Sequence, residues 1–187
     1  MRFTTPALLV TVLTLTACAT DSPTPPEPTL TTAPTADDTC RETSLAATDF
    51  GRHLNTGRIA GVDKQAWLHF DITADHFDPC ADLSWITLTG IWGEEQGPGP
   101  GAGETQSEAV IFFAGPELIT DPTPVVRARV LDVARHDDAE LAVTWREWGE
   151  NYFDPLSAPF TATYTWDGER LTVAGEGPSD MRLDLNR

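Results

Sequence analysis

The chain has 187 residues, of which 40% are hydrophobic and 9% aromatic, with six tryptophans, so it is long enough to bury one core of its own. Its formal net charge is −17, from 29 acidic and 12 basic residues. This balance argues against a nucleic-acid-binding protein, because such proteins need clustered cations to displace counterions from phosphates. It also argues against adhesion of the domain itself to anionic lipid head groups.

The N-terminal segment has the pattern of a lipoprotein signal peptide. Arg2 gives a positive start, and the nine apolar or small residues 7–15 would rise only about 14 Å as a helix, too short to cross a bilayer. Small residues then precede Cys18, the pattern that lipoprotein signal peptidase cleaves. We expect residues 1–17 to be removed and Cys18 to carry the acyl chains that anchor the protein in the cell membrane, on its extracytoplasmic face. The alternative is an ordinary cleaved signal with a coincidental cysteine.

A linker and a single domain are predicted after the anchor. More than half of residues 19–39 are Pro or Thr, a composition that cannot bury enough surface to offset the entropy of ordering. Residues 18–39 are therefore read as the lipidated cysteine and a disordered linker, which would span roughly 65 Å if it were polyproline-like. Residues 40–187 are read as one domain.

The two remaining cysteines, Cys40 and Cys80, are expected to form a disulfide, because Cys18 is engaged by lipid and the compartment is oxidising. A zinc site would need more ligands with suitable spacing, and the chain has no Cys-x-x-Cys pair.

Past Cys40 the pattern predicts one or two helices and then antiparallel strands. Residues 43–55 are read as a helix that Gly57 ends, with Gly51 as an unfavourable residue inside it. Alternating or β-branched runs predict strands at residues 66–72, 83–92, 109–114, 125–134 and 141–148. The run 109–114 is apolar on both faces, as in a central strand.

For one strand and one hairpin, the sequence also predicts which side chains share a face. Leu141, Val143 and Trp145 should share one face of their strand. Residues 162–166 and 169–174 should form a hairpin around a two-residue Asp167-Gly168 turn, which would pair Tyr164 with Leu171 and Ala162 with Val173. The fold class predicted is α+β: an antiparallel meander sheet of five to six strands with one or two N-terminal helices and one disulfide.

Candidate catalytic and metal sites each have a simpler explanation. His69, Asp71, Asp75, His76 and Asp78 lie close in sequence, but their spacing matches no metal motif, and ordinary loop and edge residues explain them. The glycine-rich residues 97–103 lack the Gly-Lys-Ser/Thr ending of a phosphate-binding loop. No nucleophile motif is present, and no cysteine remains for a thiolate. We expect no catalytic residue, no cofactor and no metal, and a protein that is not an enzyme.

One candidate recognition surface remains. Trp148, Tyr152 and Phe153 place three aromatic rings at a strand end and in the loop that follows. Such rings beside carboxylates are suited to stacking on a sugar or to holding a protein partner. The alternative is that the loop folds back and buries its rings.

The cysteine Cys18, the Thr/Pro linker and the sequence 77–85 (Phe-Asp-Pro-Cys-Ala-Asp-Leu-Ser-Trp) together resemble the LppP/LprE lipoproteins of actinobacterial envelopes. The apolar run 110–113 and the Tyr-Thr-Trp-Asp-Gly sequence at 164–168 extend the likeness over about residues 40–178. The resemblance implies a surface or cell-wall lipoprotein with no assigned activity, and it transfers no catalytic residue. Many members carry additional late cysteines, which residues 149–160 lack.

Three functions are compatible with these observations. The first is a membrane-tethered, non-enzymatic domain that binds a protein partner or a small envelope ligand. The second is a carrier of lipid or glycolipid, which requires an apolar cavity. The third is an unrecognised cell-wall hydrolase, which requires a cleft with carboxylates of shifted pKa.

Overall fold

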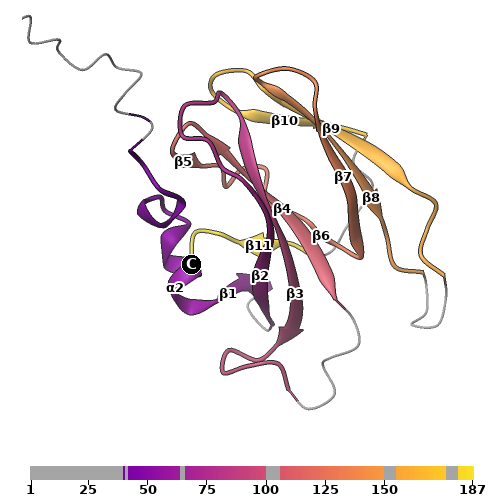
Figure 1. Ribbon diagram of the computed structural model, residues 1–187. Coiled ribbons are helices and arrows are strands. Elements are labelled where there is room, and N and C mark those ends of the chain that lie inside the picture. The colour runs from indigo at the N-terminus through magenta and orange to yellow at the C-terminus, as the bar shows by residue number, and fades with distance from the viewer. Residues whose placement is uncertain (1–39, 41, 64–65, 100–105, 150–154, 176–180) are drawn as a thin grey trace, which may run out of the picture. The chain divides into compact units, whose positions relative to one another are not determined.

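The computed structural model describes residues 40, 42–63, 66–99, 106–149, 155–175 and 181–187 (Figure 1). The predicted signal peptide, Cys18 and linker lie outside the described residues. In the part that the structure describes, no helix combines the length and the apolar character needed to span a membrane.

Two antiparallel sheets make up most of the domain (Figure 1). The first has seven strands in the order β11-β1-β2-β3-β4-β5, and β6 also pairs with β4. Its strands are β1 (Arg58–Gly61), β2 (Trp67–His76), β3 (Ser84–Gly93), β4 (Ser107–Ala114), β5 (Glu117–Leu118), β6 (Val126–Arg127) and β11 (Leu183–Asp184). The second sheet has four strands in the order β10-β9-β8-β7. Its strands are β7 (Arg129–Arg135), β8 (Glu140–Arg146), β9 (Phe160–Trp166) and β10 (Leu171–Ala174).

The central strands β3 and β4 are buried on both faces because successive side chains enter different cores. One set packs beneath the short helix α2 (Gly51–Thr56) in what we call the helix-side core, whose largest members are Phe50, Ile59, Leu68, Ile86, Leu88, Ile111, Phe113, Leu183 and Leu185. The other set packs against the second sheet in the inter-sheet core, formed by Leu83, Trp85, Val110, Phe112, Ile119, Leu141, Val143, Trp145, Ala162, Tyr164 and Leu171. The prediction that residues 109–114 form a central strand agrees with this burial.

The predicted single meander of five to six strands is corrected to two packed sheets. Residues 125–134 were expected to be one strand, but the chain leaves the first sheet after β6 and enters the second sheet at β7, with buried Ala128 between them. Apolar alternation continues through this crossing, because each half of the run has a core to face. The sequence pattern therefore could not reveal where the chain changes sheets.

Helix is scarcer than the α+β prediction required, and the fold is mostly β. The predicted helix 43–55 is split into a 3-10 turn η1 (Leu45–Ala47) and α2. Gly51 begins α2 at the break, where a Cβ atom would overlap the carbonyl oxygen of Ala46. The close approach of the two segments thus requires glycine at this position.

The last hairpin has the predicted faces but a different register. Val173 pairs with Tyr164, and Leu171 pairs with Trp166, a shift of two residues that leaves each side chain on its predicted face. The turn is centred one residue later, on Gly168-Glu169, since the Asp167 amide donates to the Arg170 carbonyl oxygen at 3.2 Å. The Asp167 carboxylate also accepts the amides of Glu169 and Arg170 at 3.0 and 2.9 Å, and these bonds lower the pKa of Asp167.

The Cys40–Cys80 disulfide is confirmed, with the two Cα atoms 5.3 Å apart. It joins the chain before α2 to the turn that precedes β3, so it closes a loop of about 40 residues around the helix-side core.

Removal of this disulfide should lower the free energy of unfolding by about 4 kcal/mol, because the cross-link restricts the unfolded chain. Urea unfolding of the exported protein should show this loss in a Cys40→Ser/Cys80→Ser double variant. Reduction of the unaltered protein should have the same effect, and an unchanged midpoint after both treatments would contradict the expectation.

His53 lies on α2 and is buried, and its Nε2 lies 3.3 Å from the carbonyl oxygen of Leu185. Burial lowers the pKa of this ring below its ordinary value, because desolvation disfavours the charged imidazolium. The fold therefore favours neutral His53. Its contribution to stability is complete above the unfolded pKa of about 6.5 and is lost as the pH falls through the lower folded value.

His53→Gln should reduce the loss of stability on acidification. Between about pH 7.5 and pH 5, the urea midpoint of the variant should fall less than that of the unaltered protein, because the folded state no longer excludes a proton that the unfolded state binds. His69→Gln is the matched control and should follow the unaltered protein. A parallel fall in all three proteins would assign the pH dependence to other groups.

Candidate functional site

Only one member of the predicted recognition surface lies within the described residues. Trp148 follows β8 and is 38% exposed, one of three large hydrophobic side chains described as exposed. Tyr152 and Phe153 lie outside the described residues. The structure thus places Trp148 at the surface and leaves the three-residue surface a prediction.

The histidines and aspartates around β2 have separate structural roles. His69 Nε2 lies 2.7 Å from the Glu94 carbonyl oxygen, and the His76 ring stacks on Trp85 with centroids 4.6 Å apart. The carboxylates of Asp75 and Asp78 accept backbone amides two residues further along the chain. Among the residues that the structure describes, no group of three His, Cys, Asp or Glu is placed to hold a metal ion.

The segment 77–85 connects β2 to β3 through structural contacts. Phe77 packs edge-on against Phe113 with centroids 5.0 Å apart, Cys80 carries the disulfide, and Leu83 is fully buried in the inter-sheet core. Trp85 lies between the stacked His76 ring and the Arg135 guanidinium, which is 5.2 Å from its centroid. The most distinctive sequence of the chain therefore contributes packing and cross-link contacts that build the fold.

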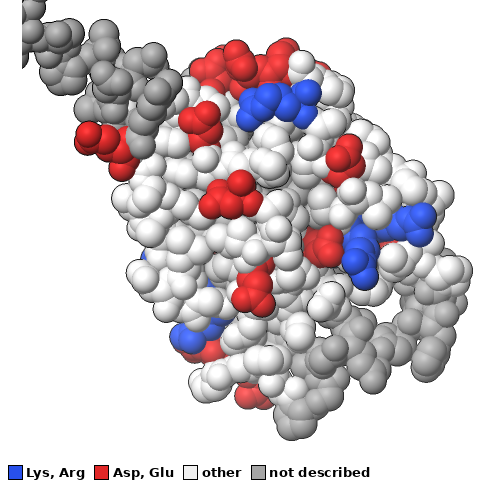
Figure 2. Space-filling view, viewed as in Figure 1, with Lys and Arg blue, Asp and Glu red and all other residues white. Residues whose placement is uncertain are grey.

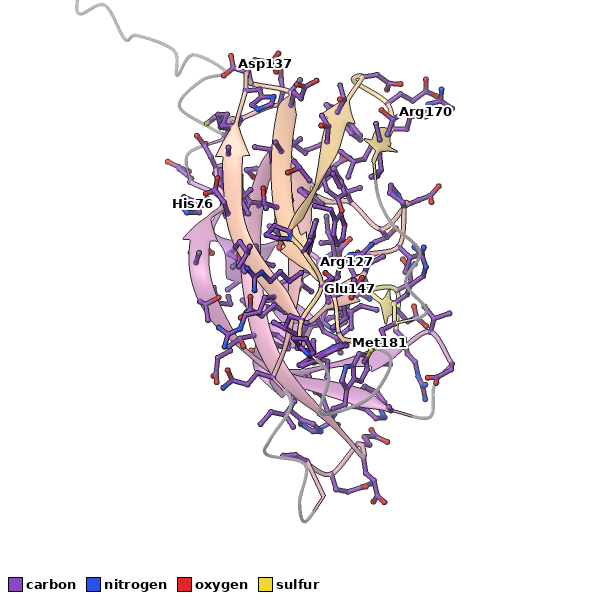
Figure 3. All side chains as sticks on the ribbon, turned by 90° about the vertical axis from the view of Figure 1, so that its right-hand side faces the viewer. His76, Arg127, Asp137, Glu147, Arg170 and Met181 are labelled. Carbon is purple, nitrogen blue, oxygen red and sulfur yellow. A yellow bond between two sulfur atoms is a disulfide. The ribbon has the colours of Figure 1, made fainter. Side chains whose placement is uncertain are left out.

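A buried ion pair marks the place where the chain crosses between the sheets. Arg127, at the end of β6, is fully buried and pairs with Glu147, which follows β8 (Figure 3). The guanidinium also lies 5.7 and 5.0 Å from the ring centroids of Trp145 and Phe160. These contacts join both sheets around one buried cation. Sequence reasoning did not single out either residue, since neither belongs to a motif.

Two recesses in the described surface have volumes of several hundred Å³. The first, which we call the Trp92 hollow, has a volume of about 500 Å³ and is lined by Gly61, Val62, Asp63, Ala66, Trp92, Met181 and Arg182. Val62 at this hollow is 52% exposed. Trp92 Nε1 is buried and has no hydrogen-bond partner in the part of the chain that the structure describes. The hollow is thus largely apolar, with Asp63 and Arg182 as its charged residues.

The second recess, the β7 groove, has a volume of about 360 Å³. It is lined by Thr73, Ala74 and His76 of β2, Trp85 and Thr87 of β3, Glu108 of β4, and residues 130–133 of β7. Its lining includes two carboxylates and neither Lys nor Arg. Neither recess was predicted, because each is formed by residues that are distant in sequence.

The described residues thus form a two-sheet β domain with two open recesses and a disulfide beside its short helix. The family of LppP/LprE lipoproteins matches residues 75–169, just over half of the chain, and the chain belongs to this family. Membership indicates a membrane-anchored envelope lipoprotein. No curated protein and no solved structure matches the chain.

Glu147→Gln should lower the free energy of unfolding by about 3 kcal/mol, because it removes the carboxylate that compensates a buried guanidinium. Glu95→Gln is the matched control: Glu95 pairs with Arg58 at the surface, at 3.2 Å, and its loss should cost less than about 1 kcal/mol. Urea unfolding measures both. Equal losses would show that the buried pair is no more important than the exposed one.

Proposed function

We propose that this lipoprotein is a non-enzymatic binding domain, held on the extracytoplasmic face of the membrane by Cys18 and its linker. Its ligand is a small envelope molecule that enters the Trp92 hollow. The observation that supports this proposal is the volume of the hollow, about 500 Å³, which falls within the roughly 300–1,000 Å³ of small-molecule sites.

The lining defines the chemistry of the ligand. Val62, Ala66, Trp92 and Met181 offer an apolar surface, with Asp63 and Arg182 as charged neighbours. Arg182 carries guanidinium N–H donors beside this surface, so a ligand oxygen is a suitable acceptor. The proposed ligand is therefore amphipathic, with an apolar body and at least one hydrogen-bond acceptor.

A lipid or glycolipid carrier is the second candidate, and it would use the same hollow. Trp92 and Met181 also pack against the helix-side core, so the hollow offers an acyl chain an apolar wall beside that core. The hydrolase alternative has less support. His53 and Asp167, whose pKa values are lowered by burial and by backbone hydrogen bonds respectively, line neither recess.

Native mass spectrometry of the protein purified gently from its own envelope tests the proposal. We expect an additional mass that leaves on activation, and its size distinguishes a lipid from a smaller ligand. Ala66→Trp should fill the hollow and lower the occupied fraction, corresponding to about a tenfold weaker affinity.

The matched control is Ala174→Trp, the same substitution at an exposed alanine of the second sheet, which should retain the additional mass. Equal melting temperatures of the two variants would show that the loss reflects binding and not unfolding. An additional mass that persists in Ala66→Trp, or its absence from the unaltered protein, would contradict the proposal.

A further inference from the structure

The outer edge of β7 carries backbone groups that no strand of the described chain pairs. The His136 amide donates to the Glu140 carbonyl oxygen at 3.0 Å, which makes these two residues a hydrogen-bonded pair. Such pairs alternate along an antiparallel ladder, so Ala134 with Ala142 is the next one. Val133 with Val143 is then a non-hydrogen-bonded pair. The amide and carbonyl of Val133 therefore point away from β8, towards the β7 groove.

The groove has the shape that an added strand needs. The second sheet has four strands, and β7 is its edge, while β2 and β3 extend beneath and beyond that edge in the other sheet. In Figure 3, β7 is the edge strand on the left, and His76 lies beyond it. A fifth strand beside β7 would lie over Trp85, Thr87 and Ala74, which face the groove.

Contacts at both ends of β7 limit the length of its edge that is open to a further strand. The Val130 amide donates to Glu108 Oε2 at 2.7 Å, and a bulge follows between Val130 and Asp132. At the other end, Arg135 Nη2 donates to the Leu83 carbonyl oxygen at 2.7 Å. The open stretch is residues 131–134, about 13 Å at roughly 3.3 Å per residue. It also contains Leu131, which is 47% exposed and would be covered by a bound strand.

The charge of the groove and of the whole chain indicates which kind of segment binds there. Of the two carboxylates in the groove lining, Glu108 is already paired with Arg129, whose Nη1 lies 3.8 Å from Glu108 Oε1, and Arg135 lies over Trp85, so Asp132 is the carboxylate left to meet a partner. Acidic side chains are spread over the face in Figure 2, and the net charge of −17 favours a basic partner over an acidic one. A second copy of this chain would bring another net charge of −17 and would be repelled. We propose that β7 binds an extended peptide segment of a partner protein with lysine or arginine side chains, as the fifth strand of the second sheet.

This site is independent of the Trp92 hollow, with which it shares no residue. The peptide backbone would supply hydrogen bonds to Val133. Its alternate side chains would face the groove floor on one side and Asp132 on the other, so an apolar residue alternating with a basic one fits best.

The test uses the full exported chain in detergent and a labelled peptide, Val-Lys-Val-Lys-Val-Lys-Val, in a fluorescence anisotropy titration. We expect saturable binding that Val133→Pro weakens at least about tenfold, because proline removes the outward amide. The net charge does not change in this variant, so general attraction between the acidic protein and a basic peptide cannot explain the loss.

Val173→Pro is the matched control. Val173 pairs with Tyr164 on the opposite edge strand, β10, also at a position whose amide points away from its neighbour, and it packs on the same core. This variant should bind the peptide within about twofold of the unaltered protein. Equal weakening by both prolines, or equal binding of a peptide with Glu in place of Lys, would overturn the proposal.

Two further measurements keep the test decisive if Val133→Pro does not fold. The same lysine peptide methylated on alternate backbone nitrogens should lose its binding to the unaltered protein, because it can no longer donate to β7. Retained binding of that peptide would overturn the proposal. Sedimentation of the unaltered protein should show a monomer, whereas a dimer that the lysine peptide does not dissociate would identify a second copy as the occupant and also overturn it.

Discussion

The central strands β3 and β4 carry large apolar side chains on both faces, and the rest of the structure depends on this constraint. Ile86 and Ile111 must be covered on one side, while Trp85 and Phe112 must be covered on the other. The short helix and β11 cover the first face, and the second sheet covers the other. The chain can supply both covers only by crossing between sheets after β6, where the buried Arg127–Glu147 pair lies.

Both recesses form where α2, β11 and the second sheet leave parts of the first sheet uncovered. The second sheet is narrower than the first, so β2 extends past the edge of β7 and leaves the β7 groove between them. Trp92, near the end of β3, packs at the margin of the helix-side core, where it lines the Trp92 hollow together with Gly61 and Met181. The segment 77–85 mainly supports the fold, through Phe77 and the disulfide, and its Trp85 also lines the β7 groove.

The sequence allowed prediction of those features that depend on local alternation or on a simple pairing. The shared face of Leu141, Val143 and Trp145 and the Cys40–Cys80 disulfide are of this kind. The hairpin register was missed because the Asp167 carboxylate binds two amides and moves the turn. The division into two sheets was not predicted, because an alternating pattern of apolar residues indicates burial but not the core in which a side chain is buried. The recesses were missed because residues such as Val62 and Met181 meet only in three dimensions.

The position of β11 has a consequence for biogenesis. Leu183 and Leu185 are fully buried in the helix-side core, and β11 pairs with β1, the first strand of the described chain. The first sheet can therefore close only after the chain has been synthesised as far as Leu185. Until then, one edge of β1 stays unpaired, so the partly folded chain is exposed to aggregation before β11 pairs with it.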